Sequence, residues 1–457
     1  MMLKHFIPIV CAGLALAGCT MIPKYERPAA PVAAQYPGAT GTNVEPAAAD
    51  IAWREVFADE RLKKLIELAL ANNRDLRVAV LNVEQSRAQY RITRSASFPT
   101  VEGGGSYTRS HASGITADRW SASLGTTAYE LDFFGRVRSL NKQALEKYFA
   151  TEEAQRSAQI SLVAEVADEY FTLRQAEEQL QLARQTLGTV QESYTLNKAT
   201  FDAGASSELD LRTAEGQVQT ARINVLTYER RIAQAQNALV LLVGRPLPAD
   251  MPAPRPFNDT NLVADVPAGL PSELVQHRPD ILEAEHTLKA ANANIGAARA
   301  AFFPTITFTG SMGTSSSQLS QLFGSGTGVW SFSPQVTVPI FTGGQNLADL
   351  DSAKVGTRIE VASYEKAIQT AFREVADALV ATSSYAHEIE AQAGLINAQQ
   401  KRFELANARY RQGDDSYLNV LSAQQDLYSA QQSQLEARLN KLASQISLYK
   451  ALGGGWK

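Results

Sequence analysis

Histidine is the side chain that most readily carries acid–base or metal chemistry near neutral pH, and this chain has five histidines. They stand far apart, at His5, His111, His277, His286 and His387. None belongs to an HExxH pattern or to another spacing that is typical of a metal site. Isolated histidines of this kind are more often surface or core groups than ligands. We therefore expect no metal site.

Two glycine-rich stretches are the remaining candidates for catalytic chemistry, because such loops can bind phosphate. They read GGG at residues 103–105 and GSGTG at residues 324–328. A phosphate-binding loop opens onto the N-terminus of a helix, whereas these two fall in a predicted strand and a predicted loop. The sequence therefore predicts that the protein is not an enzyme and binds no cofactor.

Length and composition indicate a folded chain with no preference for nucleic acid. The 457 residues are 45% apolar and 20% charged, which is typical of globular rather than disordered proteins. The formal net charge of −4 gives no indication of a nucleic-acid partner. No run of 18 apolar residues follows the N-terminal region, so no transmembrane helix is predicted there.

The N-terminus predicts export. Lys4 and His5 precede an apolar run from Phe6 to Gly18, which is too short to span a bilayer and has the size of a signal peptide. The run ends in LAGC, which resembles a bacterial lipobox. That resemblance implies removal of residues 1–18 and lipidation of Cys19, with palmitate among the acyl groups. An ordinary signal peptide that happens to contain a cysteine is the alternative.

The cysteine count bounds the chemistry of the mature chain. Cys11 and Cys19 are the two cysteines, and the first would leave with the signal peptide. With lipid on the second, no disulfide and no cysteine-based metal site would remain, although the compartment is oxidising. Thr20 follows Cys19 where some bacteria use aspartate to retain lipoproteins at the inner membrane. An outer-membrane location fits this residue better.

Two halves of the chain repeat each other. RSASFPT at residues 94–100 resembles RAAFFPT at residues 299–305, an offset of 205 (299 − 94). EVAD at residues 165–168 recurs at residues 374–377, an offset of 209 (374 − 165). A period of this length is not that of a solenoid. It indicates two similar halves side by side, as when one chain supplies two staves of a ring.

Long proline-free windows predict long helices in each half. No proline stands between Pro99 and Pro246, or from Phe341 to the end. A helix over about residues 141–201 would be roughly 90 Å long at about 1.5 Å per residue, which is typical of a coiled coil or a helical stalk. One apolar stripe repeats every seventh residue through Val166, Leu173, Leu180, Leu187, Tyr194 and Phe201.

Two glycines at matched positions interrupt these windows. Gly204 and Gly413 stand in FDAGASSELDL and YRQGDDSYLNVL, and glycine suits the left-handed residue that ends a helix. Serine, aspartate and asparagine suit the start of the next helix. The pattern predicts two helical hairpins, with returning arms over about residues 207–243 and 416–452.

The windows after each FPT alternate apolar and polar residues, as half-buried strands do. They are TITFTGSMG (305–313), RWSASLGTTAYEL (119–131), VWSFSPQVTVPI (329–340) and, more weakly because of its glycines, VEGGGSYTRS (101–110). The alternation places Trp120, Ala122, Leu124 and Ala128 on one face. Strands of about 9–11 residues have the length of membrane-spanning β-strands. Pro334 argues against a strand in its window.

Four strands cannot close a barrel, and open strand edges are not tolerated in lipid. If these strands enter a membrane, several chains must share one barrel. The duplicated FPT turn would then be the place where each stave passes from helix into sheet.

At this point the sequence resembles the outer-membrane factors of tripartite efflux systems, the TolC-like channels. More closely, it resembles the lipoprotein branch that works with resistance-nodulation-division pumps. The residues that carry the likeness are LAGC at 16–19, YELDFFGRVR at 129–138, the long stretch 270–304, VPIFTGG at 338–344 and ARYRQGDDSYLNVL at 408–421.

The resemblance implies an α+β, mainly α fold. Long helical hairpins of three chains would form a periplasmic α-barrel below a 12-stranded outer-membrane β-barrel, with four strands per chain. The expected domains are the signal peptide 1–18, a lipidated extended segment 19–60, a first repeat 61–260 with its β-hairpin near 100–131, and a second repeat 261–457 with its β-hairpin near 305–340.

The resemblance also implies function and partners. The homotrimer would be a passive exit channel of a multidrug efflux pump. It would be lipid-anchored in and would span the outer membrane, and it would extend into the periplasm. A periplasmic adaptor would couple it to an inner-membrane, proton-driven pump.

In this family the periplasmic helix tips close like an iris, held by polar links. Here the tips would be the turns at Gly204 and Gly413, which would also dock the adaptor. Tyr410 and Arg411 fall on link positions, and Arg411 could reach Asp202 of a neighbouring hairpin as a bidentate pair. The other candidate gate residues are Asp210, Asp414 and Asp415. The alternative is that all of these are solvated turn residues with capping roles.

One departure from the family pattern concerns charge. Relatives often line the aperture with aspartates in the pattern LDxLD, but this chain has Asn419 and Ser422 there. The first repeat keeps Asp210, the counterpart of Asn419 (419 − 210 = 209). A ring of carboxylates selects cations, so this aperture should be less cation selective than those relatives unless Asp210, Asp414 and Asp415 compensate.

Two other function classes stay open on the residues alone. Heptad helices would also suit a structural stalk or adhesin, although the paired β-hairpins and duplicated halves favour a pore. A channel could instead serve protein secretion of the type I kind. The lipobox and the LPAGLPSEL stretch favour efflux by resemblance.

Overall fold

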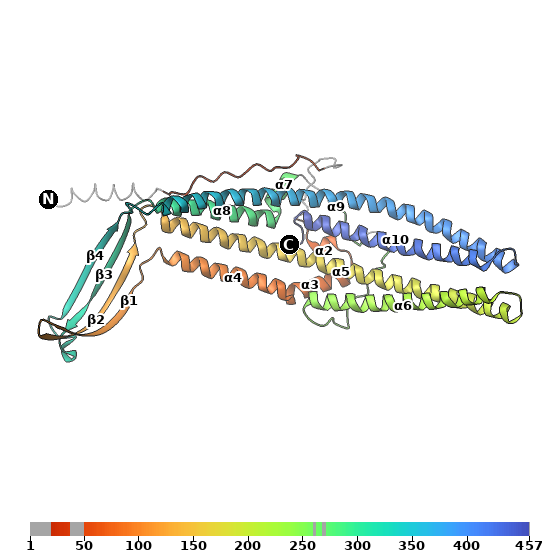
Figure 1. Cartoon of the computed structure of the whole chain (residues 1–457), viewed down its shortest axis with the longest axis horizontal. Helices are drawn as coiled ribbons and strands as arrows, with labels where there is room; N and C mark the ends of the chain where they lie inside the picture. Colours follow the sequence, from red (N-terminus) through yellow and green to blue (C-terminus); the bar gives the residue numbers. More distant parts are fainter. Residues whose placement is uncertain (1–19, 37–49, 259–261, 267–270, 457) are drawn as a thin grey trace. The chain divides into compact units, whose positions relative to one another are not determined.

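The structure is a computed structural model that describes residues 20–36, 50–258, 262–266 and 271–456 (Figure 1). The predicted signal peptide and Cys19 lie outside the described residues. Two compact units are present and are taken separately below. Unit 1 comprises Met1–Ala29, Leu81–Glu153 and Leu282–Ala367, and unit 2 comprises Ala30–Val80, Ala154–Ile281 and Ile368–Lys457. Each unit draws segments from both predicted repeats, so the division into repeats stays a prediction.

Unit 1 contains a four-stranded antiparallel sheet, as the sequence predicts. The strands are β1 (Glu102–Ala112), β2 (Ile115–Glu130), β3 (Thr305–Ser316) and β4 (Gly328–Thr337), in the spatial order β1-β2-β3-β4 (Figure 1). The hairpins β1–β2 and β3–β4 are the two predicted ones, and β2 pairs with β3 to join them. Within the described residues, β1 and β4 each keep one edge without a partner strand.

The strand predicted over residues 329–340 is present as β4, although Pro334 argued against it. Pro334 lies inside β4, opposite Phe308. Because β4 is an edge strand of the sheet, it is a place where proline is tolerated.

The sheet has an apolar face and a polar face. Leu124, Met312 and Trp330 are directly aligned across β2, β3 and β4, and directly aligned residues share a face. Met312 and Trp330 stay 69% and 80% exposed, so no part of the chain that the structure describes covers them. On the other face the hydroxyls of Ser311 and Ser331 lie 2.8 Å apart. Such alternation is typical of strands with lipid on one side and water on the other.

A β-bulge in β2 changes which residues share the apolar face. Thr126 pairs with Gly310 and Tyr129 pairs with Phe308, so three steps along β2 match two along β3. Ala128 within the bulge has a φ of 52°. Tyr129 therefore takes the position that strict alternation assigns to Ala128, and that expectation is wrong.

The two FPT turns join helix to sheet in both halves, as predicted. The first lies between α4 (Arg74–Ser95) and β1, and the second lies between α8 (Pro279–Ala300) and β3. The Tyr129 hydroxyl donates to the Ser97 carbonyl at 3.0 Å in the first turn. The Asn346 side chain donates to the Ala301 carbonyl at 2.9 Å in the second. A side chain from outside each turn therefore satisfies one of its backbone carbonyls.

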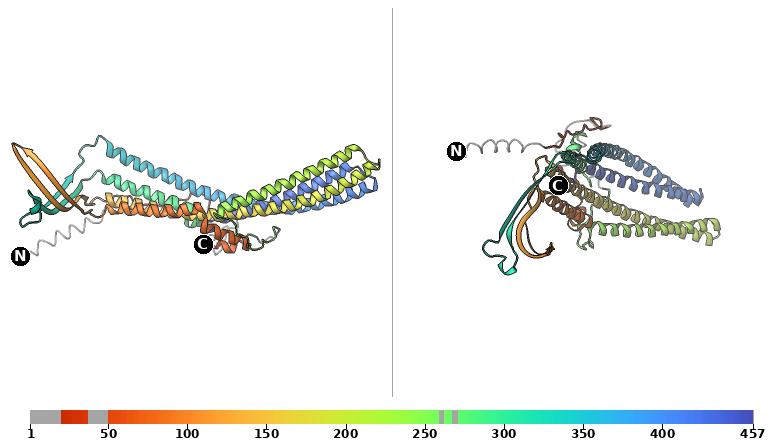
Figure 2. Two further views of the ribbon diagram at one scale, coloured as in Figure 1. Left: turned by 90° about the horizontal axis from the view of Figure 1, so that it is seen from below. Right: turned by 60° about the vertical axis from the view of Figure 1, so that its left-hand side comes forward.

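Four long helices form the predicted hairpins. They are α5 (Arg136–Asp202), α6 (Glu208–Val243), α9 (Gln345–Gln412) and α10 (Tyr417–Ala451). Both views of Figure 2 show α5 beside α6 and α9 beside α10. Helices α5 and α9 contribute residues to both units. Across the described residues, no helix combines the length and apolarity that crossing a membrane requires.

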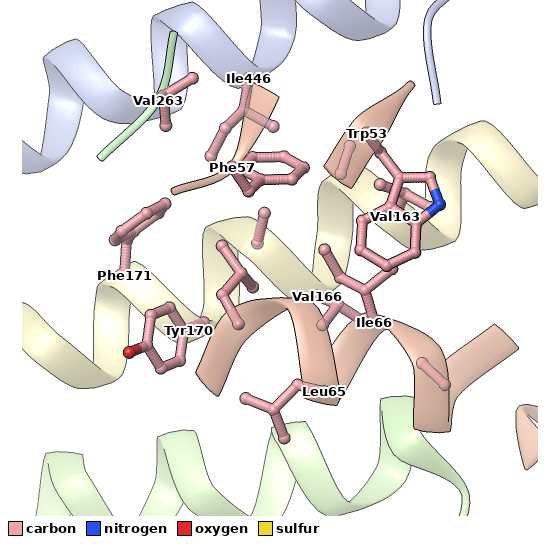
Figure 3. Close-up of a cluster of buried hydrophobic side chains, with 14 of the residues drawn as sticks. Trp53, Phe57, Leu65, Ile66, Val163, Val166, Tyr170, Phe171, Val263 and Ile446 are labelled. Carbon is pink, nitrogen blue, oxygen red and sulfur yellow. The ribbon is translucent and has the colours of Figure 1, made fainter. Parts of the chain in front are cut away.

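The core of unit 2 packs short N-terminal helices against the long ones. Helices α2 (Trp53–Val56) and α3 (Glu60–Asn72) place Trp53, Phe57 and Ile66 against Tyr170 of α5 and Ile446 of α10 (Figure 3). Each of these side chains is at most 1% exposed. The predicted extended segment 19–60 therefore contains one helical turn, because its apolar side chains are buried here. A short helix, α7 (Pro271–His277), precedes α8.

One buried carboxylate organises this core. Asp59, only 1% exposed, accepts from the backbone N–H groups of Arg61 at 2.8 Å and Leu62 at 3.2 Å, and so caps α3. Its other oxygen accepts from the Tyr170 hydroxyl at 2.9 Å and from the backbone N–H of Arg255 at 2.8 Å. A buried carboxylate with four donors is satisfied and links three segments.

Candidate functional site: the two helical tips

The two tips, both in unit 2, have the same backbone turn. Gly204 and Gly413 have φ values of 72° and 81°, the left-handed region that glycine adopts without strain. Gly204 N–H donates to Phe201 and Ala205 N–H donates to Thr200, each at 2.8 Å. At the second tip Gly413 donates to Tyr410 and Asp414 donates to Arg409, each at 3.0 Å. These paired bonds are the Schellman ending of a helix, so both glycines have the structural role that their spacing predicts.

The returning helices start differently at the two tips. Ser207 caps α6, because its hydroxyl accepts from Asp210 N–H at 3.1 Å and donates to the Asp210 carboxylate at 2.7 Å. Ser416 makes no side-chain cap at the start of α10. Instead the Asp415 carboxylate accepts from Ser416 N–H at 2.8 Å and from the Asn419 amide at 2.5 Å. The second repeat has Asn419 where the first has Asp210. At this tip Asp415 supplies the carboxylate near the start of the returning helix instead.

Asp415 is held in its charged form. The hydrogen bond from the Asn419 amide, then the bond from Ser416 N–H, lower its pKa below the ordinary range. Arg409 adds to this effect, with its Nε 3.6 Å from the carboxylate. Hydrogen bonds to the charged form favour it. Asp415 therefore stays a carboxylate near neutral pH, beside the guanidinium of Arg409.

Tyr410 of α9 links the second helical hairpin to the first through a partly buried hydrogen bond. Its hydroxyl donates to Oδ1 of Asn197 in α5 at 2.8 Å. Its ring lies 5.5 Å from the Tyr417 ring, in an apolar cluster that also contains Ala214 and Val420. Burial, with a further contribution from the charge of Asp210, raises the pKa of Tyr410, so the hydroxyl stays a donor.

The sequence interpretation missed Asn197. It is fully buried. Its amide nitrogen donates to the Ser193 carbonyl at 2.9 Å, and its amide oxygen accepts a hydrogen bond from the Tyr410 hydroxyl. The one available indication was the repeat itself, because its counterpart is Ala406 (406 − 197 = 209). When a polar residue stands in place of alanine on a helix face that packs against another helix, its buried polar atoms need a hydrogen-bond partner.

The remaining candidates are exposed at the tips. Asp202 pairs with Lys198 of its own helix at 3.1 Å. Arg411 and Asp414 are exposed, and within the part of the chain that the structure describes no ion pair of Arg411 is found. The single chain therefore does not bring Arg411 and Asp202 together, and their pairing between neighbouring hairpins stays a prediction.

Comparisons with known proteins identify the family to which the whole chain belongs. A family model described as outer membrane efflux protein matches residues 65–245 and 270–454. The chain belongs to the outer membrane efflux protein family. The family prediction from the sequence is confirmed.

Relatives of this family resemble the chain over nearly its whole length. Toluene efflux pump outer membrane protein TtgC of Pseudomonas putida is 47% identical, over 100% of this chain and 96% of the relative. Cation efflux system protein CusC of Escherichia coli is 43% identical, over 98% of each. The solved open state of the Neisseria gonorrhoeae MtrE outer membrane channel is 43% identical with a TM-score of 0.90, over 96% of this chain and 99% of that chain.

These findings confirm several predictions from the sequence. The chain has a mainly helical α+β fold with a four-stranded antiparallel sheet. It is an outer-membrane efflux channel of this family rather than an enzyme. Lipidation of Cys19, the gate residues and the pump partners stay predictions.

Proposed function

We propose that three copies of this chain form one exit channel of a tripartite efflux pump, lipid-anchored at Cys19 and gated at the helix tips. The observation that carries the proposal is the open, two-faced sheet of unit 1. Among the described residues, nothing covers its apolar side chains and no strand pairs with the outer edges of β1 and β4. Unpaired backbone groups cost several kcal/mol each in lipid, so β4 of one copy pairs with β1 of the next. Three copies give a closed barrel of twelve strands.

The helical hairpins of the three copies form a periplasmic duct. Each copy contributes two hairpins, and their tips form the aperture. The Tyr410–Asn197 bond holds α9 to α5 within a copy, while Arg411 reaches Asp202 of the neighbouring copy. Exposed ion pairs are individually weak, at about 0–1 kcal/mol. Repeated by symmetry, they close the aperture without locking it.

The partners are a periplasmic adaptor and an inner-membrane pump of the resistance-nodulation-division class. Each tip supports docking of another protein, because it leaves leucines exposed at equivalent positions of the repeat. They are Leu196 and Leu209 at the first tip, and Leu405 and Leu418 at the second. The names of the relatives, which include toluene and antibiotic efflux pumps, support small-molecule cargo.

The proposal is tested by planar-bilayer recording of the purified mature protein, with an efflux assay in cells that lack their own exit channel. We expect discrete, small current steps, and restored resistance to antibiotics or solvents when the cognate adaptor and pump are present. Absence of current from correctly assembled trimers would overturn the channel and favour a stalk. Current together with export of a protein, and no restored resistance, would favour a protein-secretion duct.

The Asn419→Asp variant is expected to make the channel more cation selective. Asn419 donates to Asp415 at 2.5 Å, so the variant places a second carboxylate beside the first in every copy, and carboxylate rings favour cations. The reversal potential in a KCl gradient should move toward the potassium potential. Like charge raises the pKa of a carboxyl, so the gain should shrink on acidification.

Asn440→Asp is the matched control, because it adds the same charge to the same helix, α10, away from the tip. An equal shift in both variants would show that the charge acts through the overall field of the duct and not at the aperture.

A further inference from the structure

The described N-terminal segment of unit 1 is docked along one face of α8. Between Met21 and Arg27 it contacts α8 at five positions with spacings of four, three, four and three residues. These positions are Glu285, Lys289, Asn292, Gly296 and Arg299. That spacing follows one face of a helix. The segment therefore occupies the length of α8 from its first turns to its last.

One end of the segment is held by a charged clamp. Arg27 donates to both carboxylate oxygens of Glu285, from Nε at 2.9 Å and from Nη2 at 2.6 Å. The Tyr25 hydroxyl donates to the same carboxylate at 3.1 Å, and Lys289 lies 3.1 Å from it. The Glu285 side chain is 3% exposed. The Arg27 side chain is 45% exposed, so the buried partner of the pair is the carboxylate. A bidentate pair is specific in geometry.

The charge state of the clamp is stable. Burial alone would raise the pKa of Glu285, but the hydrogen bonds and charges of Arg27 and Lys289 outweigh it and hold the pKa below the ordinary range. A carboxylate with a lowered pKa stabilises the docked form above its unfolded pKa and loses this contribution only in acid. The clamp is therefore closed at neutral pH.

The other end of the segment is held through its backbone. Asn292 donates to the Pro23 carbonyl at 2.9 Å and Arg299 donates to the Met21 carbonyl at 3.2 Å. Between them, a Cβ on Gly296 would lie 2.6 Å from Ile22 Cγ1. The absence of a side chain at Gly296 thus allows the segment to lie directly on the helix, and these three contacts set its register.

These contacts give a structural role to residues that have none in the proposed channel and its gate. Glu285, Asn292, Gly296 and Arg299 all fall in the stretch 270–304, which carries most of the sequence resemblance. The segment runs antiparallel to α8, so Met21 lies at the end of α8 from which the chain enters β3 at Thr305. The start of the described chain is held beside the entry to the sheet.

We propose that residues 20–29 are a positioning strap that holds the lipid-bearing N-terminus beside the sheet, so that the acyl chains enter the membrane next to the strands. Lipid on Cys19 is part of the proposed function, and the strap rests on it. An unbound chain from Arg27 back to residue 19 could reach about 30 Å at about 3.5 Å per residue. Because Arg299 holds Met21, only two residues of chain separate residue 19 from a fixed point, which limits its reach to about 7 Å.

The physical gain is the coupling of two membrane attachments. Acyl chains hold a protein in a membrane less firmly than membrane-spanning segments do. When the acyl chain is fixed next to the sheet, each attachment raises the effective concentration of the other at the membrane. The partner that the strap serves is therefore the lipid surface itself.

The test measures the distance between spin labels at Thr20→Cys and Ser352→Cys, both in unit 1, by pulsed electron paramagnetic resonance of the full-length trimer in lipid. The native chain is compared with a clamp variant, Arg27→Gln with Glu285→Gln, and with a lipid-free Cys19→Ser chain exported by an ordinary signal peptide. Lys24→Gln with Glu26→Gln is the matched control. It removes an exposed pair on the same segment, 4.0 Å apart with side chains 88% and 82% exposed.

We expect a narrow distance distribution in the native, control and lipid-free chains, and a several-fold broader one in the clamp variant. A distribution that broadens as much in the lipid-free chain would show that the lipid holds the segment, which overturns the strap. A narrow distribution in the clamp variant would overturn it as well. Mass spectrometry of the N-terminal peptide and the bilayer current report separately on lipidation and on the channel, so failure of the proposed function is distinguishable.

Discussion

The Tyr410→Phe, Arg411→Ser variant is expected to be open far more often than the wild-type channel, by roughly a hundredfold. Tyr410→Phe removes the bond to Asn197, and one such bond is worth about 1 kcal/mol net. Three copies in the trimer give about 3 kcal/mol, which is on the order of a hundredfold in the ratio of open to closed channels. Arg411→Ser removes the ion pair proposed between copies. Single-channel recording in planar bilayers measures the result.

Two further variants locate the effect. Asn197→Ala removes the same bond from the other side, so it should reproduce Tyr410→Phe, and combining the two should add little. Tyr228→Phe is the matched control, because Tyr228 donates to Gln432 at 3.1 Å between α6 and α10 rather than at the Tyr410–Asn197 link. If Tyr228→Phe opens the channel as strongly, general loosening of the hairpins and not a link at the tips governs opening.

The Asp59→Ala variant is expected to lower the free energy of unfolding by about 3–5 kcal/mol. It leaves four donors without their acceptor in a core that is nearly free of solvent, and it removes the cap of α3. Chemical denaturation followed by the fluorescence of the chain measures the change, since Trp53, 1% exposed, reports on this core.

Two further variants distinguish the loss of the buried hydrogen-bond network of Asp59 from the loss of a surface charge. Asp59→Asn keeps an acceptor for the cap and should retain a large part of the stability. Glu60→Ala, which removes the neighbouring carboxylate with a side chain 70% exposed, should cost less than about 1 kcal/mol. An Asp59→Ala chain as stable as Glu60→Ala would contradict a structural role for the Asp59 network.

Local patterns in the sequence predicted the helical hairpins, the strands and the turns between them, but not every end: α5 begins at Arg136 rather than near residue 141, and β4 ends at Thr337 rather than at residue 340. The FPT words mark the turns from α4 and α8 into the sheet, because proline and its neighbour cannot continue a helix. Gly204 and Gly413 end α5 and α9, because the left-handed residue of a Schellman turn favours glycine. Period-two alternation found both hairpins. Each of these features depends on residues close together in the chain.

The family resemblance supplied what local patterns could not. Heptads do not distinguish an efflux channel from a stalk, since both need long helices, and the paired hairpins favour a pore without indicating its cargo. The stretch 270–304 carried the likeness, and its residues turned out to contact the N-terminal segment. Their types follow from that contact, as Gly296 shows where Ile22 leaves no room for a side chain.

The sequence by itself determined the two helical hairpins, the four strands, the matched glycine turns and the membership of an efflux family. Only the tertiary structure decided which side chains meet. It placed Asn197 against Tyr410, 213 residues away, and Glu285 against Arg27, 258 residues away. It also shifted β2 by a bulge that moves Tyr129 into the place expected for Ala128. Helix and turn preferences act between neighbours, whereas these contacts depend on packing between segments distant in sequence, which no local pattern encodes.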